Sequence, residues 1–368
     1  MRTKEVHCAK CLEIFKDQLF NTVNGLYIYD ETNGLWTSDE YDIMRVVDLH
    51  SNEIFINWKD SVKQKTLLSL YDSALPLVKA RAPFKAEFLA DTKKNRGFFL
   101  FFNGVLDCST FTMRPFSADL FFTRRIHRDF DPLLVNDEDE VAVIEKLFNS
   151  AYTVPGSEPN TEEQFLFKGD FDTSKRDLVL QKLSRGLILG GVDKEFLMLL
   201  GETNCGKGVL TQFLEHTFHE YVGTFNTPNL QQKKCSLTFD GKRWAWIANL
   251  WDCRLIIGNH LAQKPLNADM LKALVTDGDK ITYKLLYQNA VEVEMMACLV
   301  VFDNDYHFVK AVERALIIYA DRSSSTEDTF DAAEFFKADT TIKDVFNRST
   351  KLQDAFIRIL CKYYQRSL

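Results

Sequence analysis

The sequence predicts an α/β domain that follows an α+β amino-terminal domain. Residues 196–200 form an apolar run short enough for a buried strand, and the chain continues into a glycine-containing turn and then a helical pattern. Three later apolar runs, 254–259, 298–302 and 315–319, are further strands, with a helix expected at 266–276. The length of 368 residues fits two domains rather than one.

The turn after the first of these strands has the spacing of a phosphate-binding loop. Gly201 is followed by four residues and then by Gly206-Lys207, which is the pattern G-x4-G-K. Glycines let successive backbone N–H groups face one anion at the start of the next helix, and the lysine reaches the outer phosphates of a nucleotide. Gly208 stands where a serine or threonine hydroxyl normally holds magnesium. The alternative interpretation is a glycine turn without a ligand.

Composition and charge limit the possible partners. The formal net charge is −7, so the surface as a whole does not attract nucleic acid. DNA binding would need a local basic patch or basic loops gathered by oligomerisation. The first residues lack the apolar stretch of a signal peptide, and no apolar run approaches membrane-spanning length. We therefore expect an intracellular protein with reduced cysteines and no membrane partner.

The amino-terminal half combines helices with hairpins. Apolar positions recur at helical spacing over 6–23, and 26–36 read as a hairpin with Asn33-Gly34 at its tip. Residues 97–107 form a second strand pair around another Asn-Gly turn. This half is therefore predicted to be α+β.

Two polar clusters in this half have both a functional and a structural interpretation. His7, Cys8 and Cys11 have zinc-like spacing, or else Cys8 and Cys11 lie on the apolar face of a helix. The basic run 124–128 could contact phosphates, or it could be a solvated edge paired with the aspartates that follow it.

The middle of the chain contains a domain boundary. A helix is expected from Asn136, as a cap, to Ser150, because its first turn is acidic. A polar loop at 155–160 separates it from a helix at 178–189, and the tryptophans at 244–251 suggest one more helix. We place the domain boundary between this loop and the Gly190-Gly191 turn that precedes the strand at 196–200, with the helix at 178–189 as a bridge.

The order of these motifs resembles the superfamily 3 helicases of DNA viruses and mobile elements. Within them the chain is most similar to the poxvirus and satellite-phage primase-helicase group, and the resemblance covers most of residues 20–320. Besides the phosphate loop, it depends on a hairpin beginning at Asp277-Gly278 and on the front-half motifs Asn103-Gly104-Val105-Leu106-Asp107, Arg114-Pro115 and Phe122-Thr123. The resemblance implies an AAA+-like P-loop NTPase motor at 193–330. An amino-terminal domain at 1–160, a helical linker at 161–192 and a helical tail at 331–368 complete the expected division.

The resemblance also implies a role for individual residues. Lys207, Asn304 and Arg314 would be catalytic. Lys207 would bind the β- and γ-phosphates, Asn304 would orient the attacking water or sense the γ-phosphate, and Arg314 would reach a neighbouring subunit's nucleotide in a ring. DNA would be gripped by the hairpin residues Lys280, Lys284, Tyr287 and Gln288. ATP would be bound by Gly201, Glu202, Thr203, Asn204, Cys205, Gly206, Lys207, Gly208 and Val209. Structural alternatives are a turn cap for Asn304, a surface ion pair for Arg314 and hairpin packing for Tyr287.

Magnesium is the point at which the sequence departs from this family. The strand at 255–258 runs into Asn259-His260, where the family has an acidic residue that binds Mg²⁺, and Gly208 lacks the hydroxyl. Asp252 and Asp303 are possible replacements, and the metal ligands stay unknown.

Two functions therefore remain for this chain. One is an ATP- and Mg²⁺-dependent DNA helicase, an NTP hydrolase that forms a hexamer on single-stranded DNA. It would act in the host cytoplasm or at a viral replication site, with or without a separate primase or polymerase. The other is a ring that binds nucleotide and DNA as a loader or scaffold without turnover. A P-loop kinase is a weaker third reading.

Overall fold

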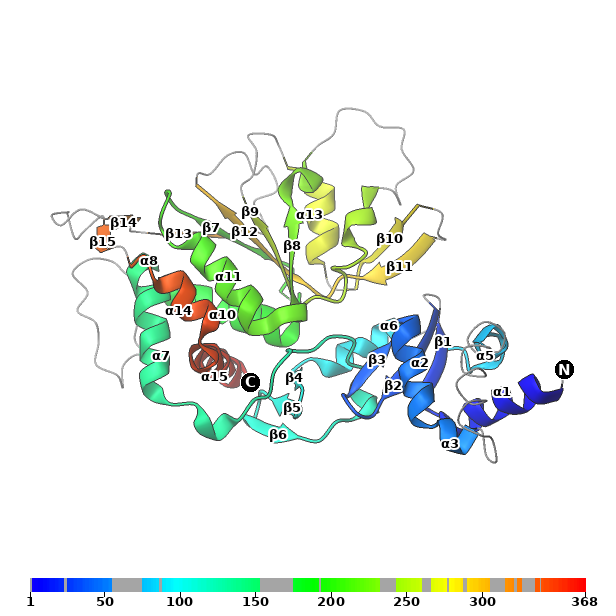
Figure 1. Cartoon of the computed structure of the whole chain (residues 1–368). Coiled ribbons are helices and arrows are strands. Elements are labelled where there is room, and N and C mark those ends of the chain that lie inside the picture. The colour runs from blue at the N-terminus through cyan, green and yellow to red at the C-terminus, as the bar shows by residue number, and fades with distance from the viewer. Residues whose placement is uncertain are drawn as a thin grey trace. The chain divides into compact units, whose positions relative to one another are not determined.

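The computed structural model (Figure 1) describes residues 2–22, 25–54, 75–85, 88–152, 175–191, 193–231, 243–259, 266–276, 278–286, 290–304, 315–320, 323–325, 335–337 and 339–368. Contacts divide the chain into two units, residues 1–95 with 115–123 and residues 96–114 with 124–368. Residues 96–114 and 124–152 thus group with the carboxy-terminal unit, earlier in the chain than the expected boundary near residue 160. Among the described helices, none is long and apolar enough to cross a membrane.

The first unit is built on an antiparallel three-stranded sheet. Its strands, in the order β1-β2-β3, are Leu19–Thr22, Gly25–Asp30 and Leu35–Thr37. The predicted hairpin is confirmed: Gly34 has φ +75°, and its N–H donates to the carbonyl oxygen of Asp30 at 2.8 Å. The α-helices among the described residues of this unit are α1 (Arg2–Ile14), α2 (Glu40–Leu49), α3 (Ser51–Ile54), α5 (Leu75–Arg81) and α6 (Phe88–Asp91).

The first helix is shorter than its apolar periodicity predicts. Helix α1 ends at Ile14, and Asp17 takes a left-handed conformation with φ +65°, which a continuing helix cannot accommodate. The prediction of helix to residue 23 is therefore wrong, because residues 19–22 pair with β2 instead.

The cysteines of α1 pack in the core of the first unit. Cys8 and Cys11 are buried in one apolar cluster with Phe15. Burial, with Cys8 nearby, raises the pKa of the Cys11 thiol to about 12, which opposes the thiolate that a metal needs. The described residues contain no group of three or more His, Cys, Asp or Glu side chains that could hold a metal ion. These contacts fit the helix-packing interpretation of the cluster.

The second unit contains an α/β domain with a parallel five-stranded sheet. Its strands are paired in the order β13-β7-β12-β9-β8, and every pairing is parallel. Their bounds are Phe196–Leu200 (β7), Val222–Asn226 (β8), Leu255–Asn259 (β9), Cys298–Asp303 (β12) and Ala315–Tyr319 (β13). Strand β12 thus lies between the strand that precedes the glycine loop and the strand that ends at Asn259. All five carboxyl ends meet at one edge of the sheet.

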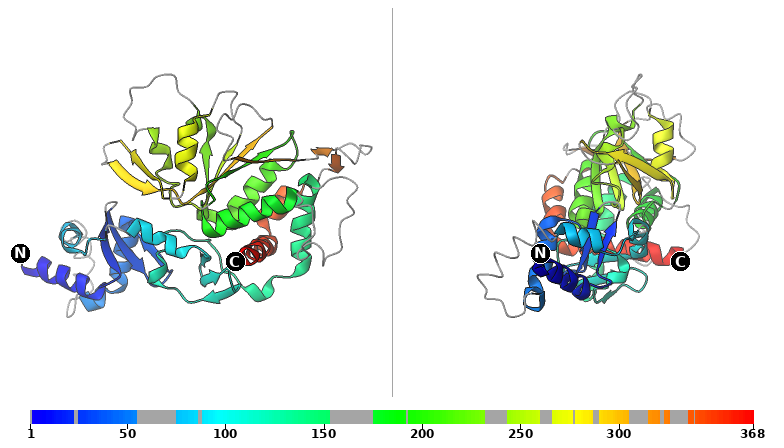
Figure 2. Two further views of the ribbon diagram at one scale, coloured as in Figure 1. Left: turned by 180° about the vertical axis from the view of Figure 1, so that it is seen from behind. Right: turned by 90° about the vertical axis from the view of Figure 1, so that its right-hand side faces the viewer.

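Helices cover both faces of this sheet (Figure 2). Alternate residues such as Leu197 and Phe302 belong to the apolar cluster that includes α10 (Lys175–Leu189), α11 (Lys207–Phe218) and α15 (Thr350–Ser367). Helix α13 (Ala268–Val275) instead packs against β12, and its buried residues lie outside that cluster. The alternation along each strand thus supplies two apolar faces, as a buried parallel sheet requires.

Further elements complete the second unit. The hairpin β10–β11 is confirmed at Lys280–Lys284 and Ala290–Glu294. Strands β4 (Phe98–Phe101), β5 (Gly104–Asp107) and β6 (Thr112–Arg114) form a small antiparallel sheet, and β14 (Ser323–Ser325) pairs with β15 (Phe335–Lys337). Further helices among the described residues include α7 (Asp137–Val143), the π-helical turn η4 (Ile144–Asn149), α8 (Ser150–Tyr152) and α14 (Ile342–Arg348).

Two sequence predictions in this unit are wrong. The segment with the three tryptophans contains only the 3-10 turn Ala245–Ile247 rather than a helix. The carboxy-terminal tail is not helical throughout, because residues 335–337 form β15 before α14 begins. The cap at Asn136 is confirmed, since its side chain accepts a hydrogen bond from the N–H of Asp139 at 2.8 Å.

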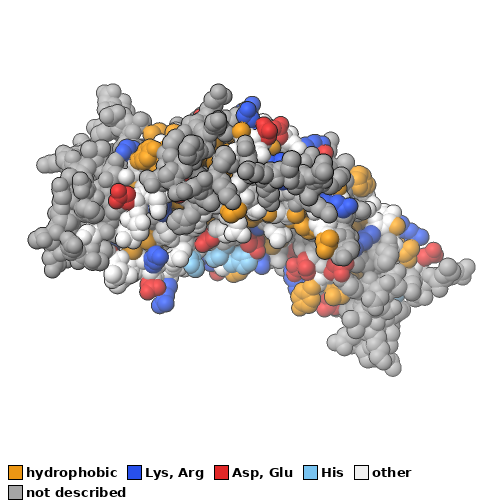
Figure 3. Space-filling model, turned by 90° about the horizontal axis from the view of Figure 1, so that it is seen from above, with side chains coloured by type: hydrophobic (Ala, Val, Ile, Leu, Met, Phe, Trp, Pro, Cys, Tyr) orange, Lys and Arg blue, Asp and Glu red, His pale blue; other side chains and the backbone are white. Residues whose placement is uncertain are grey.

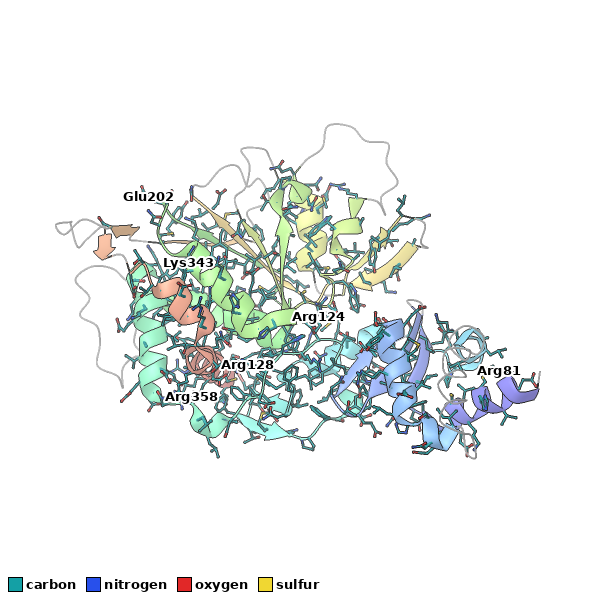
Figure 4. All side chains as sticks on the ribbon, viewed as in Figure 1. Arg81, Arg124, Arg128, Glu202, Lys343 and Arg358 are labelled. Atoms are coloured by element: carbon teal, nitrogen blue, oxygen red, sulfur yellow. The ribbon has the colours of Figure 1, made fainter. Side chains whose placement is uncertain are left out.

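Most of the basic run at 124–128 is held inside the second unit. Arg124 donates to the carbonyl oxygens of Glu220 and Asn249 at 3.0 and 2.7 Å and forms an ion pair with Asp252. Arg128 pairs with Asp354 of α15, and Figure 4 shows Arg128 near that helix. The expected pairing with the aspartates that follow the run is therefore wrong for these two arginines, which connect elements distant in sequence.

Replacing Phe346 by alanine tests the packing of α14. Phe346 is fully buried. Its ring lies edge-on to that of Phe213 on α11, with the two ring centroids 5.2 Å apart. We expect Phe346→Ala to lower the free energy of unfolding of this unit by about 3–5 kcal/mol, measured by denaturant titration, because it leaves a cavity. The adjacent Val345 is 46% exposed, so Val345→Ala should change stability by less than about 0.5 kcal/mol. Equal losses in the two variants would contradict this packing.

Candidate nucleotide-binding site

A large cavity lies at the carboxyl edge of the parallel sheet. Its volume is about 1750 Å³, more than the ~300–1000 Å³ of typical ligand pockets. The glycine loop and the first turns of α11 form one wall, and the ends of β8, β9 and β12 contribute Asn226, Asn259 and Asn304. Residues of η4 and α14 also line it. The cavity therefore lies where open α/β sheets bind their ligands.

Backbone conformation explains the glycines of the loop. Gly206 has φ +92°, and Asn204, at φ +69°, uses the left-handed region that asparagine tolerates. A Cβ on Gly201 would lie 2.6 Å from Sγ of Cys205 and 2.8 Å from Cβ of Ala320, so only glycine fits without a shift. Helix α11 begins at Lys207, and its first N–H groups have no acceptor within the helix. The loop therefore presents N–H donors and the positive end of a helix dipole.

Lys207 folds back on the loop that precedes it. Its ammonium group donates to the carbonyl oxygens of Gly201 and Glu202, the second at 2.8 Å, and lies 3.3 Å from Sγ of Cys205. Figure 4 shows Glu202 at the loop end of β7. Lys207 and residues 203–206, 208 and 209 line the cavity, whereas Gly201 and Glu202 contribute the carbonyl oxygens behind it. The predicted loop residues are thus brought together around one lysine.

Asn304 lies on the same cavity as the loop. It is exposed, lines the cavity directly after β12, and its backbone N–H donates to Oδ1 of Asp303 at 2.8 Å. The N–H of Gly201 donates to the carbonyl oxygen of Asp303 at 3.2 Å, which joins the start of the loop to the end of β12. Lys207 and Asn304, from distant parts of the sequence, therefore border one space.

The two carboxylates proposed as magnesium ligands do not reach this space. Asp252 pairs with Arg124 before β9 begins, at the opposite edge of the sheet, and does not line the cavity. Asp303 is buried between two cavity-lining residues, Phe302 and Asn304, but does not line the cavity itself, because side chains alternate along a strand. Neither is placed as a metal ligand in this structure.

The described donors around the loop do not fit a magnesium site. Gly208 offers no oxygen ligand, and β9 ends in the amide of Asn259 rather than a carboxylate. Carboxylates that do line the cavity have other partners or lie elsewhere: Asp339 accepts from Thr341 and pairs with Lys146 at 3.6 Å, and Glu145 accepts from Asn149. Glu215, also on the lining, follows Lys207 by eight residues on α11, which is about 12 Å along a helix.

Sequence reasoning missed the second wall of the cavity. Lys146 comes from the π-helical turn η4, and Lys343 comes from α14, two segments far from the loop in sequence. π-Helical turns are frequent at functional sites, but nothing in the amino-acid pattern distinguishes this one from a continuous α-helix. No local signal placed either lysine at the loop.

The predicted DNA hairpin presents a mixed face. Lys280, Thr282 and Lys284 are exposed and alternate with buried Ile281 and Tyr283. Lys280 forms an ion pair with Glu292 of β11 at 2.8 Å, and this hydrogen bond raises the pKa of the lysine. On the face drawn in Figure 3, the described Lys and Arg side chains lie among Asp and Glu side chains rather than in one continuous patch.

Several predicted residues lie outside the described part of the chain. These are Arg314, Tyr287 and Gln288, together with His260, which follows Asn259. Their predicted roles stay predictions.

Comparisons with known proteins find one family model and one viral protein that are similar to parts of this chain. Residues 199–322, from the end of β7 to just after β13, match the model of a family described as a family of unknown function, DUF5906. The chain is 21% identical over 290 residues to a Sputnik virophage protein named "Putative helicase V13". That match covers 74% of this chain and 33% of the virophage protein, so the chain spans about a third of its length.

Solved structures of the NrS-1 C-terminal region are also similar. Its apo structure has a TM-score of 0.40 at 13% identity and covers 61% of this chain and 45% of that chain. An A-form apo structure of the same region gives 0.38 at 13% identity, with 61% and 44% covered.

Two glycines of the loop should respond oppositely to alanine. Gly206→Ala meets no atom within 4 Å but forces a side chain into φ +92°, so we expect a loss of about 1–2 kcal/mol. At Gly208, a Cβ meets only Nζ of Lys343, at 3.9 Å, so Gly208→Ala should gain up to about 1 kcal/mol from helix propensity. Thermal unfolding of both variants checks this, and shifts in the same direction would contradict the loop conformation.

Proposed function

We propose that the chain is the motor of an ATP-dependent DNA helicase of the superfamily 3 type, with an AAA+-like fold, which acts as a hexameric ring in viral or mobile-element replication. One observation carries this proposal: a strand–glycine loop–helix at the carboxyl edge of a parallel sheet, with Lys207 and Asn304 on one cavity. The similarity to a virophage protein named as a helicase supports the class of function.

ATP binding would use the loop and the amino end of α11. The N–H groups of residues 204–208 would bind the β- and γ-phosphates. Lys207 would exchange the carbonyl oxygens of Gly201 and Glu202 for phosphate oxygens, and a bond between two charged groups is the stronger one. Asn304 would hold a water beside the terminal phosphate. Because the described donors do not fit Mg²⁺, these protein groups would have to offset most of the negative charge of the phosphates.

DNA binding and ring formation extend the proposal beyond this cavity. Lys280 and Lys284 project from the exposed face of β10, and a ring of such hairpins would gather positive charge around single-stranded DNA. Arg314 would complete the nucleotide site of the next subunit. A separate primase or polymerase would act beside the ring at the viral replication site.

A nucleotide-binding ring without turnover is the second candidate function. The observation that favours it is the replacement of both usual magnesium contacts, by Gly208 and by Asn259 at the end of β9. Such a ring would bind ATP and DNA as a loader or scaffold.

Steady-state ATP hydrolysis, with and without single-stranded DNA, tests the proposed motor. We expect DNA-stimulated turnover in the wild type and a loss of at least about 100-fold in Lys207→Ala, because the lysine stabilises charge that develops on the phosphates. Lys272→Ala is the matched control, since this exposed lysine of α13 does not line the cavity. Its rate should equal that of the wild type.

Two outcomes would count against the motor. Full turnover in Lys207→Ala would show that hydrolysis takes place elsewhere. ATP binding that requires Lys207, with no turnover under any condition, would favour the ring without hydrolysis.

A further inference from the structure

A second lysine lies at the position where the phosphate loop lacks a hydroxyl. Nζ of Lys343 is 3.9 Å from the point that a Cβ on Gly208 would occupy, and both residues line the cavity. A serine or threonine at Gly208 would project its oxygen into the same space. The ammonium group of Lys343 therefore stands next to the place of the missing magnesium ligand.

The packing of α14 on α11 holds Lys343 there. Phe346 follows Lys343 by three residues, on the same face of the helix, and its buried ring packs against Phe213. One residue further, Asn347 donates from Nδ2 to Oε1 of Gln212 at 3.2 Å. These contacts fix α14 against the middle of α11, because Gln212 and Phe213 lie there. Figure 4 shows Lys343 on α14 beside that helix.

Lys343 has no ion-pair or hydrogen-bond partner among the residues that the structure describes, and it is exposed. The other cavity lysines differ: Lys146 pairs with Asp339, and Lys207 donates to its own loop. An exposed lysine without a carboxylate keeps its charge available for an anion. Two lysines, Lys207 and Lys343, therefore line the cavity near the amino end of α11.

We infer that Lys343 is a second phosphate-binding lysine, which takes the place of Mg²⁺ so that the cavity binds a nucleoside triphosphate without a divalent cation. This inference rests on the proposed nucleotide site. The triphosphate would lie with its outer phosphates between the two lysines. The two ammonium groups would neutralise the negative charge of the phosphates. In other phosphate loops Mg²⁺, held by a hydroxyl and a carboxylate, does this.

The test is ATP binding by calorimetry to the full chain, once in excess EDTA and once in excess Mg²⁺. We expect the wild type to bind ATP in EDTA at least as tightly as in Mg²⁺. Lys343→Ala should bind about tenfold or more weakly in EDTA, as expected for the loss of a charged hydrogen bond. Lys343→Arg keeps the charge and should retain most of the affinity.

Matched controls separate this inference from the proposed function. Lys351→Ala removes an exposed lysine of α15 that does not line the cavity, and it should bind ATP as the wild type does. Because Lys343 is exposed, Lys343→Ala should keep the thermal unfolding midpoint of the wild type. Lys207→Ala should lose binding in both conditions.

The outcomes that would overturn the inference are distinct from those that would overturn the nucleotide site. Binding that requires Mg²⁺ in the wild type, or unchanged affinity of Lys343→Ala in EDTA, would show that Lys343 does not replace the metal while the site itself stands. Failure of the wild type to bind ATP in either condition would overturn the site.

Discussion

The join between β7 and β12 is the constraint on which the candidate site depends. Leu200 pairs with Asp303 in parallel register, and the N–H of Gly201 continues this pairing onto the carbonyl oxygen of Asp303. This hydrogen bond holds the start of the glycine loop beside the end of β12. Lys207 and Asn304 therefore line one cavity. A shift of one residue in the register would turn Asn304 to the other face of the sheet. The cavity therefore results from strand pairing more than from the loop sequence alone.

The amino-acid pattern predicts the parts of this unit that local physics decides. The strand, loop and helix at 196–218 follow from an apolar run, a glycine turn and helical spacing, and each is present, with Gly206 in the left-handed region. The second wall could not be predicted, because η4 and Lys343 reach the loop only through tertiary packing. The helix expected at 244–251 is absent for a related reason. This segment contains a 3-10 turn, with Trp244 and Trp246 stacked on each other, and apolar spacing alone does not distinguish such a turn from an α-helix.

The charged side chains of the lining determine which ligands the cavity favours. Lysines approach the loop from α11 and α14, whereas the carboxylates on the lining are engaged by Thr341 and Asn149 or lie further along α11. Such a site favours an anion and offers few oxygen ligands to a hard cation. In the described state, Lys207 satisfies the loop's own carbonyl oxygens, and a phosphate would replace weaker neutral acceptors. This exchange would favour phosphate binding whether or not the bound nucleotide is hydrolysed.

The most direct measurement of the central claim is a crystal structure of the full chain with a non-hydrolysable ATP analogue. The account predicts that the outer phosphates lie against the N–H groups of residues 204–208, with Nζ of Lys207 moved from the carbonyl oxygens of Gly201 and Glu202 onto phosphate. An analogue bound away from the loop, or phosphates in the cavity with Lys207 still on those carbonyl oxygens, would contradict it.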